Sequence, residues 1–245
     1  MDVRTIRDLW SPELRNHRTV DVYLPASYEG SRRRYPVVYM QDGQNLSDPA
    51  AAFAGTWHLA EALRALADDG IEAIVVGIHN MGPARLAEYS PFPDPRHGGG
   101  RGQAYLRFVA RTLKPRIDRS FRTRRRREST FIAGSSMGGL IALYALYSAP
   151  GIFGGAAAMS PSLWFGRGRM LTLAARSRPP RGRLYLDVGT AEGYATLHDT
   201  RRFRDRLLDR GFDSRRLKYV ESEGATHDEA AWGARLPDAL RFLLD

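Results

Sequence analysis

Short apolar runs recur along the chain, and longer segments with helical spacing separate them. The short runs are rich in Val, Ile and Tyr, which favours β-strands. They predict strands at residues 35–40, 73–78, 129–133, 183–188 and 217–220. The segments between them, of about 10 to 18 residues, predict helices, and strands that alternate with helices are typical of a parallel sheet. We therefore expect an α/β fold with a mostly parallel central sheet and helices on both faces, in a single domain over residues 1–245.

The pattern G-x-S-x-G occurs at residues 134–138, between the predicted strand at 129–133 and an apolar helical run at 140–146. In α/β-hydrolases such a turn holds a nucleophilic serine at strained backbone angles, and small residues on both sides let strand and helix approach each other. Ser136 is therefore the candidate nucleophile, and the pattern indicates an α/β-hydrolase fold. Only one helix, at 169–176, fits between the strand that ends near Met159 and the strand that starts at Leu184, so no large lid is expected. The alternative is a glycine-rich turn that contains serines by chance.

A serine becomes a good nucleophile when a base takes its proton, and in this fold the acid and the histidine follow the serine in the chain. The loop after the fourth predicted strand carries Glu192, which is the candidate acid. The last predicted strand leads to His227, the candidate base, and an amphipathic helix follows it. Two other carboxylates stay open as the acid, because Asp187 lies inside the fourth strand and Asp199 lies on the helix after it.

The oxyanion of a tetrahedral intermediate is usually bound by two backbone N–H groups, one after the nucleophile and one from the loop after an early strand. Met137 supplies the first of these groups. The first predicted strand opens into a loop at 41–45, where the N–H of Gln44 is the candidate for the second. An ordinary tight turn at Asp42 and Gly43 would have the same sequence, and both interpretations can hold together.

Over residues 19–244 the chain resembles the esterase family of α/β-hydrolases that contains siderophore esterases, feruloyl esterases, S-formylglutathione hydrolase and mycolyltransferases. The motifs that carry the resemblance lie at residues 39–45, 134–139, 160–164, 189–192 and 224–227, together with Trp232. The resemblance implies a serine ester hydrolase with Ser136, Glu192 and His227 as its catalytic triad and without a cofactor. The chain has no cysteine, so it lacks the thiols associated with formylglutathione hydrolases, which argues against that subgroup.

These features predict a serine carboxylic-ester hydrolase that forms an acyl-enzyme intermediate on a small or aryl, siderophore-type ester. The same acyl-enzyme could pass its acyl group to an alcohol, which would make the protein an acyltransferase. A non-catalytic binding module on a hydrolase fold is the alternative from another class of function. The expected partner is a small-molecule ester, and the sequence leaves the oligomeric state open.

A long irregular stretch at 79–102 follows the second predicted strand, and loops of this length in compact domains are often functional. Because it leaves the carboxyl end of a strand, it should border the site and could place Arg85, Glu88 or Tyr89 there. Arg85 and Glu88 are the candidate substrate contacts. These two residues could instead pair with each other and stiffen the loop. Trp164 follows the strand that ends near Met159 and is a further candidate for the wall of the substrate site, or else a buried tryptophan without such a role.

The chain carries a formal net charge of +10, and nearly all of its cations are arginines, with the densest cluster at 124–127. This cluster leads into the amino end of the strand before Ser136, whereas ligands in open α/β sheets bind at the carboxyl ends. We therefore expect it on the face opposite Ser136, as a solvated surface. Nucleic-acid binding is not expected, because arginines scattered along the chain are as easily a compositional bias as a binding surface.

No apolar run reaches the roughly 18 residues that a membrane-spanning helix requires. The start of the chain lacks the basic-then-apolar order of a signal peptide. The expected location is the cytoplasm, although an exported protein whose signal peptide has been removed would have a similar sequence. The lack of cysteine removes disulfides and thiolate metal sites, and we expect neither a metal ion nor another cofactor.

Overall fold

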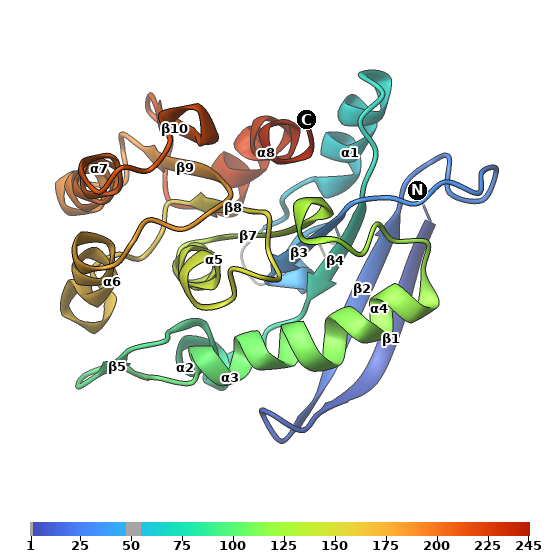
Figure 1. Ribbon diagram of the computed structural model, residues 1–245, viewed down its shortest axis with the longest axis horizontal. Coiled ribbons are helices and arrows are strands. Elements are labelled where there is room, and N and C mark those ends of the chain that lie inside the picture. The colour runs from blue at the N-terminus through green and yellow to red at the C-terminus, as the bar shows by residue number, and fades with distance from the viewer. Residues whose placement is uncertain (1, 48–54) are drawn as a thin grey trace.

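An eight-stranded sheet runs through the molecule in the order β1-β2-β4-β3-β7-β8-β9-β10 (Figure 1). The computed structural model describes residues 2–47 and 55–245. The strands of the sheet are β1 (Asp2–Ser11), β2 (Asn16–Leu24), β3 (Val37–Gln41), β4 (Ile74–Ile78), β7 (Thr130–Ser135), β8 (Gly155–Met159), β9 (Arg183–Gly189) and β10 (Leu217–Ser222). β1 pairs antiparallel with β2, and β2 with β4, whereas the other neighbouring pairs are parallel. A separate ribbon consists of β5 (Pro93–Asp94) and β6 (Gly98–Gly99).

The parallel part of the sheet is covered on both faces, which explains why its strands appear in the sequence as continuous apolar runs. Every residue of β3, β4, β7 and β8 is buried. Neighbouring residues of β3 point to opposite faces, so that Val37 and Tyr39 enter one hydrophobic core while Val38 and Met40 enter the other.

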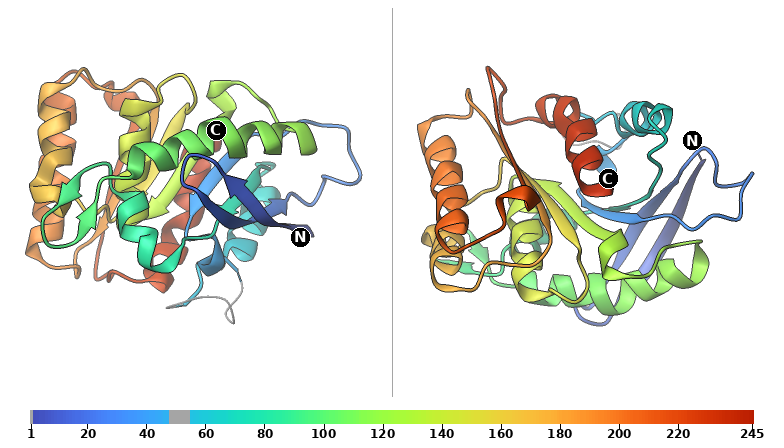
Figure 2. Two further views of the ribbon diagram at one scale, coloured as in Figure 1. Left: turned by 90° about the horizontal axis from the view of Figure 1, so that it is seen from below. Right: turned by 45° about the horizontal axis from the view of Figure 1, so that its top comes forward.

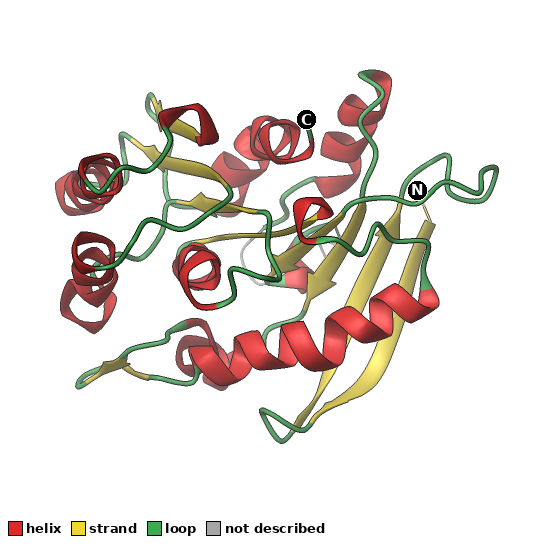
Figure 3. Ribbon diagram, in the orientation of Figure 1, coloured by secondary structure: helices red, strands yellow, loops and turns green. Residues whose placement is uncertain are grey.

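Two layers of helices cover these faces, and Figure 3 shows them in red on both sides of the sheet. The helical segments are α1 (Leu59–Asp68), α2 (Arg85–Tyr89), α3 (Gly102–Arg107), a π-helical segment (Phe108–Leu113), α4 (Lys114–Ser120), α5 (Met137–Ser148), α6 (Phe165–Arg176), α7 (Tyr194–Asp209) and α8 (Glu229–Leu244). α1 and α8 pack on one face and the others on the opposite face, as the right panel of Figure 2 shows for α8 and α4. In the ranges that the structure describes, no helix is long and apolar enough to cross a membrane.

The α/β fold and the mostly parallel sheet are confirmed, and each predicted strand is present with ends within two residues of the prediction. The sequence pattern does not predict β1 and β2. Most residues of β1 are exposed, so this strand shows no continuous apolar run. The stretch at 79–102 is only partly irregular, because it contains α2, a 3-10 turn at Gly82–Ala84 and the β5–β6 ribbon. The single domain over residues 1–245 stays a prediction.

Candidate active site

Ser136 stands at the turn between β7 and α5, with φ 54° and ψ −119°. A positive φ is uncommon for a residue with a side chain, and in this type of turn it exposes the hydroxyl group. The Ser136 N–H donates to the carbonyl oxygen of Met159 in β8 at 2.9 Å. A Cβ atom on Gly134 would lie 2.7 Å from the Gln41 side chain and 2.8 Å from the carbonyl carbon of Gly138. A side chain at Gly134 would therefore clash with these neighbours, which explains the glycine of the sequence pattern.

His227 lies in the loop between β10 and α8 and contacts Ser136. Its Nε2 atom is 3.0 Å from the Oγ of Ser136, and its Nδ1 atom is 2.7 Å from the Oε2 of Glu192. When Nδ1 carries the proton and donates it to the carboxylate, Nε2 is left as an acceptor for the serine hydroxyl. Trp232 of α8 packs against the imidazole with 4.9 Å between ring centroids, which supports the ring in this position. Three loops thus bring a serine, a histidine and a carboxylate into one chain of hydrogen bonds.

Glu192 is the carboxylate that reaches His227, and its side chain is fully buried. Its second oxygen, Oε1, accepts from the N–H of Gly189 at 2.7 Å and from the hydroxyl of Ser160 at 2.5 Å. Hydrogen bonds to a carboxylate favour its ionised form, so this arrangement suits a group that balances the charge of an imidazolium.

The two alternative acids bind arginines instead of the imidazole. Asp187 is fully buried in β9, where Nε of Arg235 donates to it at 2.8 Å. Burial raises the pKa of Asp187 to about 6, against the opposing effect of Arg235. Asp199 lies on α7 and is 3.4 Å from Arg202 on the same helix. Of the three candidates, the structure brings Glu192 to the imidazole.

The loop after β3 begins with Asp42 in the left-handed conformation, at φ 55°, and continues into a 3-10 turn, η1 (Gly43–Asn45). The backbone passes so close to β4 that a Cβ atom on Gly43 would lie 2.4 Å from the carbonyl carbon of Gly77. This close approach fixes the position of the next residue, Gln44. Its side-chain Oε1 accepts from the N–H of Asn80 at 3.1 Å.

A cavity of about 490 Å³ opens beside Ser136 and His227. Its other lining residues are Asp42, Gln44, Asn45, Trp57, Asn80, Gly82, Arg85, Ser135, Glu229 and Trp232. Burial raises the pKa of Glu229, and the nearby carboxylate of Asp42 adds to this effect. Met137 follows the candidate nucleophile as the first residue of α5, where N–H groups have no partner within the helix. Across the described ranges, no group of three or more His, Cys, Asp or Glu side chains is placed to hold a metal ion.

Arg85 borders this cavity, but its guanidinium group is already bound by the protein. Nε and Nη2 donate to the two carboxylate oxygens of Asp42 at 2.7 and 2.8 Å. Asn80 donates to the same carboxylate at 2.7 Å, and the hydroxyl of Tyr89 accepts from the Asp42 N–H at 3.1 Å. Three residues that follow β4 in the chain therefore clamp the loop that carries Gln44.

The prediction that Glu88 borders the substrate site is wrong. Its side chain is fully buried, and it accepts from Nη2 of Arg18 at 2.7 Å and from Asn16 at 3.0 Å. A buried guanidinium requires a carboxylate partner, and Glu88 supplies it. The alternative, a pair between Arg85 and Glu88, is wrong as well, because Arg85 binds Asp42.

Trp164 does not line the cavity at Ser136. Its residue exposure is 51%, so the alternative of a buried tryptophan is also wrong. The ring packs edge to face against His97, next to the β5–β6 ribbon, with centroids 5.5 Å apart. Both rings line a different cavity of about 270 Å³. In this loop it is Ser162, two residues earlier, that faces Ser136.

Two serines of the loop after β8 belong to the site, and the sequence reasoning does not identify them. The Oγ of Ser162 is 3.1 Å from the Oγ of Ser136, and the N–H of Ser162 donates to the Ser136 carbonyl oxygen at 3.0 Å. Ser160 donates to Glu192, as described above. The available signal was the motif at 160–164, whose two serines flank a proline directly after a strand.

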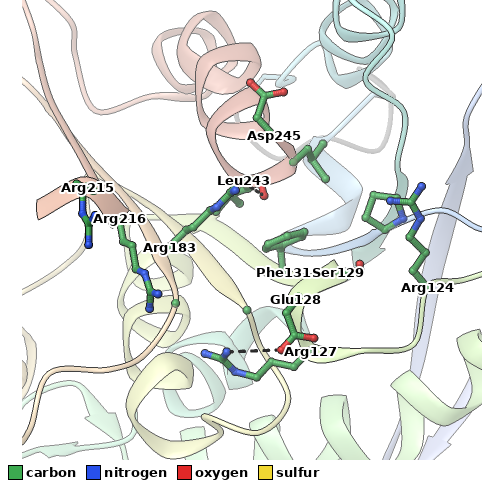
Figure 4. A pocket seen from close by; sticks show the side chains of 14 residues that line it. Arg124, Arg127, Glu128, Ser129, Phe131, Arg183, Arg215, Arg216, Leu243 and Asp245 are labelled. Carbon is green, nitrogen blue, oxygen red and sulfur yellow. Dashed lines mark hydrogen bonds and ion pairs between the residues drawn. The ribbon is translucent and has the colours of Figure 1, made fainter. Parts of the chain in front are cut away.

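The arginine cluster at 124–127 precedes the amino end of β7, whereas Ser136 follows its carboxyl end, so the two lie at opposite edges of the sheet. Figure 4 shows Arg124 and Arg127 of the cluster among the side chains that line a pocket at the amino end. Arg127 of this cluster and Arg183 line another cavity of about 490 Å³ there. Both guanidinium groups bind backbone carbonyl oxygens, Arg127 that of Pro150 at 2.5 Å and Arg183 that of Leu243 at 3.3 Å. These two arginines therefore tie chain segments together, and the position of the cluster agrees with the prediction.

Comparison with known proteins adds to this picture. The sequence profile of the family described as "Putative esterase" matches residues 11–243. The chain is 27% identical to the uncharacterized protein YbbA of Bacillus subtilis (strain 168), over 93% of this chain and 92% of YbbA. It is 30% identical to the ferri-bacillibactin esterase BesA of the same organism, over 53% of this chain and 48% of BesA.

Among solved structures, an IroE-like serine hydrolase from Shewanella oneidensis aligns with a TM-score of 0.79 and 25% identity. The alignment covers 99% of this chain and 80% of that chain. The fold similarity thus extends over almost the whole sequence, whereas the match to BesA spans about half of each protein.

Proposed function

The chain belongs to the esterase family, and on that premise we propose that it hydrolyses carboxylic esters with Ser136 as nucleophile, His227 as base and Glu192 as acid. The observation that carries the proposal is the unbroken chain of hydrogen bonds from Ser136 through His227 to Glu192, at 3.0 and 2.7 Å. It supports a serine esterase because each atom has the partner that proton transfer requires.

In the acylation step, Oγ of Ser136 attacks the carbonyl carbon of the ester while Nε2 of His227 takes the hydroxyl proton. Negative charge moves to the carbonyl oxygen, and the N–H groups of Met137 and Gln44 hold it. The place of Met137 in the first turn of α5 and the place of Gln44 on the cavity wall support these roles. When the intermediate collapses, the imidazolium protonates the departing alkoxide, an alcohol leaves, and Ser136 remains acylated.

Water completes the cycle. Nε2 of His227 takes a proton from water, the hydroxide adds to the acyl carbon, and the second intermediate collapses as the imidazolium returns the proton to Ser136. A carboxylic acid leaves. The side chain of His227 is 40% exposed, which supports access of water to the acyl-enzyme. Glu192 stays ionised throughout and stabilises the imidazolium.

The proposed substrate is a small or aryl ester, which includes siderophore-type esters. A cavity of about 490 Å³ has room for a small ester or for one arm of a larger one. Trp57 and Trp232 give its wall an apolar part, and the activity named for the relative BesA supports a siderophore-type ester. The cytoplasmic location stays a prediction of the sequence.

Arg85 serves the oxyanion site in this proposal. Two of its nitrogens are bound by Asp42, which largely neutralises its charge toward an anionic substrate. Its role is to hold Asp42, and with it the turn that presents the N–H of Gln44. A positioning role therefore takes the place of the substrate contact that the position of its loop suggests for Arg85.

Substitution of the nucleophile tests the proposal. Ser136→Ala should lower ester turnover by about 10⁴ or more, because the covalent route disappears while binding and oxyanion stabilisation remain. Turnover would be measured on p-nitrophenyl esters of graded chain length, aryl esters and a catecholate trilactone. Labelling of the wild type by a fluorophosphonate, with loss of the label in Ser136→Ala, would locate the reactive serine.

Ser148→Ala is the matched control, because Ser148 is an exposed serine at the end of the helix that begins at the active-site turn. This variant should keep wild-type turnover. If Ser136→Ala retained most of the activity, another nucleophile would have to carry the reaction. Added alcohol would separate hydrolysis from acyl transfer, since a transferase yields a new ester as its main product.

A further inference from the structure

A buried polar cluster formed by Ser160, Asp187 and Arg235 lies behind Glu192. Ser160 and the side chain of Asp187 are fully buried, and the Arg235 side chain is 7% exposed. Arg235 comes from α8, the helix that follows His227 in the chain. The cluster therefore links the loops after β8 and β9 to the element that supports the imidazole.

Ser160 connects this cluster to Glu192, and its hydroxyl proton has one available direction. The Oγ of Ser160 is 3.0 Å from Nε1 of Trp232 and 3.1 Å from Nη2 of Arg235. Indole and guanidinium groups only donate, so Ser160 accepts from both. Its single proton is then left for Oε1 of Glu192 at 2.5 Å. The backbone of Ser160 is in the left-handed conformation, with φ 45°. The N–H of Ser160 donates to the Asp187 carbonyl oxygen at 3.0 Å, which stabilises this conformation.

Arg235 lies between two buried carboxylates. Its Nε is 2.8 Å from Oδ2 of Asp187, and its Nη2 is 3.7 Å from Oε1 of Glu192. Together with Glu192, the cluster holds one cation and two anions, a net charge of −1 while His227 is neutral. When His227 takes the serine proton, the sum becomes zero. Because charges interact strongly away from water, this balance favours the imidazolium that the reaction requires.

Other titratable groups also face this region. Tyr185 of β9 is hydrogen-bonded to Asp187, and Asp228 at the start of α8 interacts with Arg235. On the cavity side, Asp42, Arg85 and Glu229 border the same opening as His227. None of the substitutions below changes these groups, so they form a constant background for the comparison.

We propose that Arg235 is a positioning residue for the reaction: through Ser160, and anchored by Asp187, it keeps Glu192 ionised and aimed at Nδ1 of His227. The inference rests on the proposed esterase function. A guanidinium group suits this place because its planar fork can serve Asp187 and Ser160 at the same time.

Two substitutions that remove charges of opposite sign test the proposal. The measurement is the acid limb of the pH profile of kcat/KM. Arg235→Met removes a cation, so the buried carboxylates hold the imidazolium of His227 more strongly. The acid limb should move to higher pH by about 1 unit. At pH 7 kcat should therefore fall about tenfold, and much of this loss should be recovered at pH 9. Asp187→Asn removes an anion and should move the limb down. Arg235→Lys, which keeps the charge but not the fork, should lie between Arg235→Met and the wild type.

A matched control is Arg241→Met, which removes a partly exposed arginine from the same helix, where it pairs with Asp69. Its pH profile should equal that of the wild type. KM should change little in the Arg235 variants, because Arg235 does not touch the substrate. Should Arg235→Met fail to fold, the double variant Arg235→Met/Asp187→Leu replaces the buried pair by apolar side chains. Its charge balance is that of the wild type, so its acid limb should lie near the wild-type position, whereas kcat should still fall because Ser160 has lost a donor that orients its hydroxyl toward Glu192; a wild-type kcat would contradict the positioning role.

Acid limbs that move in opposite directions for Arg235→Met and Asp187→Asn support the proposal. Limbs that stay in place, or that move the same way, would overturn it and leave the esterase assignment intact, because wild-type turnover and Ser136→Ala test that assignment separately. If the wild type hydrolysed no ester at all, the proposed function would fail. The pH dependence of fluorophosphonate labelling at Ser136 would then measure the same acid limb and still decide the role of Arg235.

Discussion

Both oxygens of Glu192 accept hydrogen bonds. A glutamine has only one acceptor oxygen, so it cannot replace the carboxylate in both of these contacts. In Glu192→Gln the amide oxygen should take the place that accepts from Gly189 and Ser160, because both groups donate there. The amide NH₂ group then faces His227. The imidazole must accept at Nδ1 and carry its proton at Nε2, so it can no longer accept from Ser136. We expect kcat to fall by about 10³ to 10⁴ with the fold retained, as measured by ester turnover and circular dichroism.

Asp199→Asn is the control for this substitution, because Asp199 is the alternative acid and lies on α7 beside Arg202. It should keep full activity. Loss of activity in Asp199→Asn together with an active Glu192→Gln would move the acid to α7 and contradict the hydrogen bond between Glu192 and His227.

For single residues, the sequence predicts the location of a side chain well when the position of the backbone alone determines what that side chain contacts. Ser136 and His227 follow strand ends in the order that the hydrolase fold requires, so a linear pattern is enough to predict that they lie at one edge of the sheet, where the structure places their side chains 3.0 Å apart. Glu88 and Trp164 were placed by loop position alone. Their contacts depend on which way each side chain points, and Glu88 turns to Arg18 in the core while Trp164 turns to His97.

At the scale of elements, the turn after β3 owes its position to residues that follow β4. Arg85→Ala removes two hydrogen bonds from Asp42 and should loosen the turn that carries Gln44. We expect kcat to fall about tenfold for neutral and anionic esters alike, because the oxyanion is common to all of them. Steady-state kinetics on a neutral and an anionic ester of similar size would measure this.

Asp42→Asn should cause a similar loss, and the double variant should be little worse than either single variant, since both act through one contact. A loss confined to anionic esters in Arg85→Ala, with Asp42→Asn unaffected, would instead assign Arg85 to the substrate. The two results differ in substrate dependence and in additivity, so each serves as a check on the other.

The elements that the sequence predicts well are those buried on both faces. β3, β4 and β7 are buried throughout because helices cover both sides, and their mostly apolar sequences leave a strong local signal. β1 has no such signal, since it lies at the edge of the sheet and owes its extended form to pairing with β2. The same holds for the β5–β6 ribbon, whose strands are two residues each and depend on a tertiary contact with α6.

At the scale of the whole molecule, two groups of functional and charged side chains lie at opposite ends of the parallel strands. The carboxyl ends carry the serine, the carboxylate and the imidazole, and the amino ends carry the arginine cluster at 124–127. The sequence predicts this division because the direction of a parallel strand fixes which loop emerges at which edge. It does not predict that Arg127 and Arg183 bind carbonyl oxygens, because those partners come from segments far away in the chain.

This separation predicts how charge affects substrate binding. β7 has six residues and spans about 20 Å between the arginine cluster and Ser136, which exceeds twice the Debye length of about 8 Å at 0.15 M salt. Arg125→Gln/Arg126→Gln, which changes two exposed arginines of the cluster, should therefore leave KM for an anionic ester unchanged at this ionic strength. At about 0.01 M salt the Debye length reaches about 30 Å, and KM for the anionic ester should rise in the variant while a neutral ester of similar size is unaffected. A higher KM at 0.15 M salt would mean that the cluster contacts the substrate directly, which the opposite edges of the sheet do not allow.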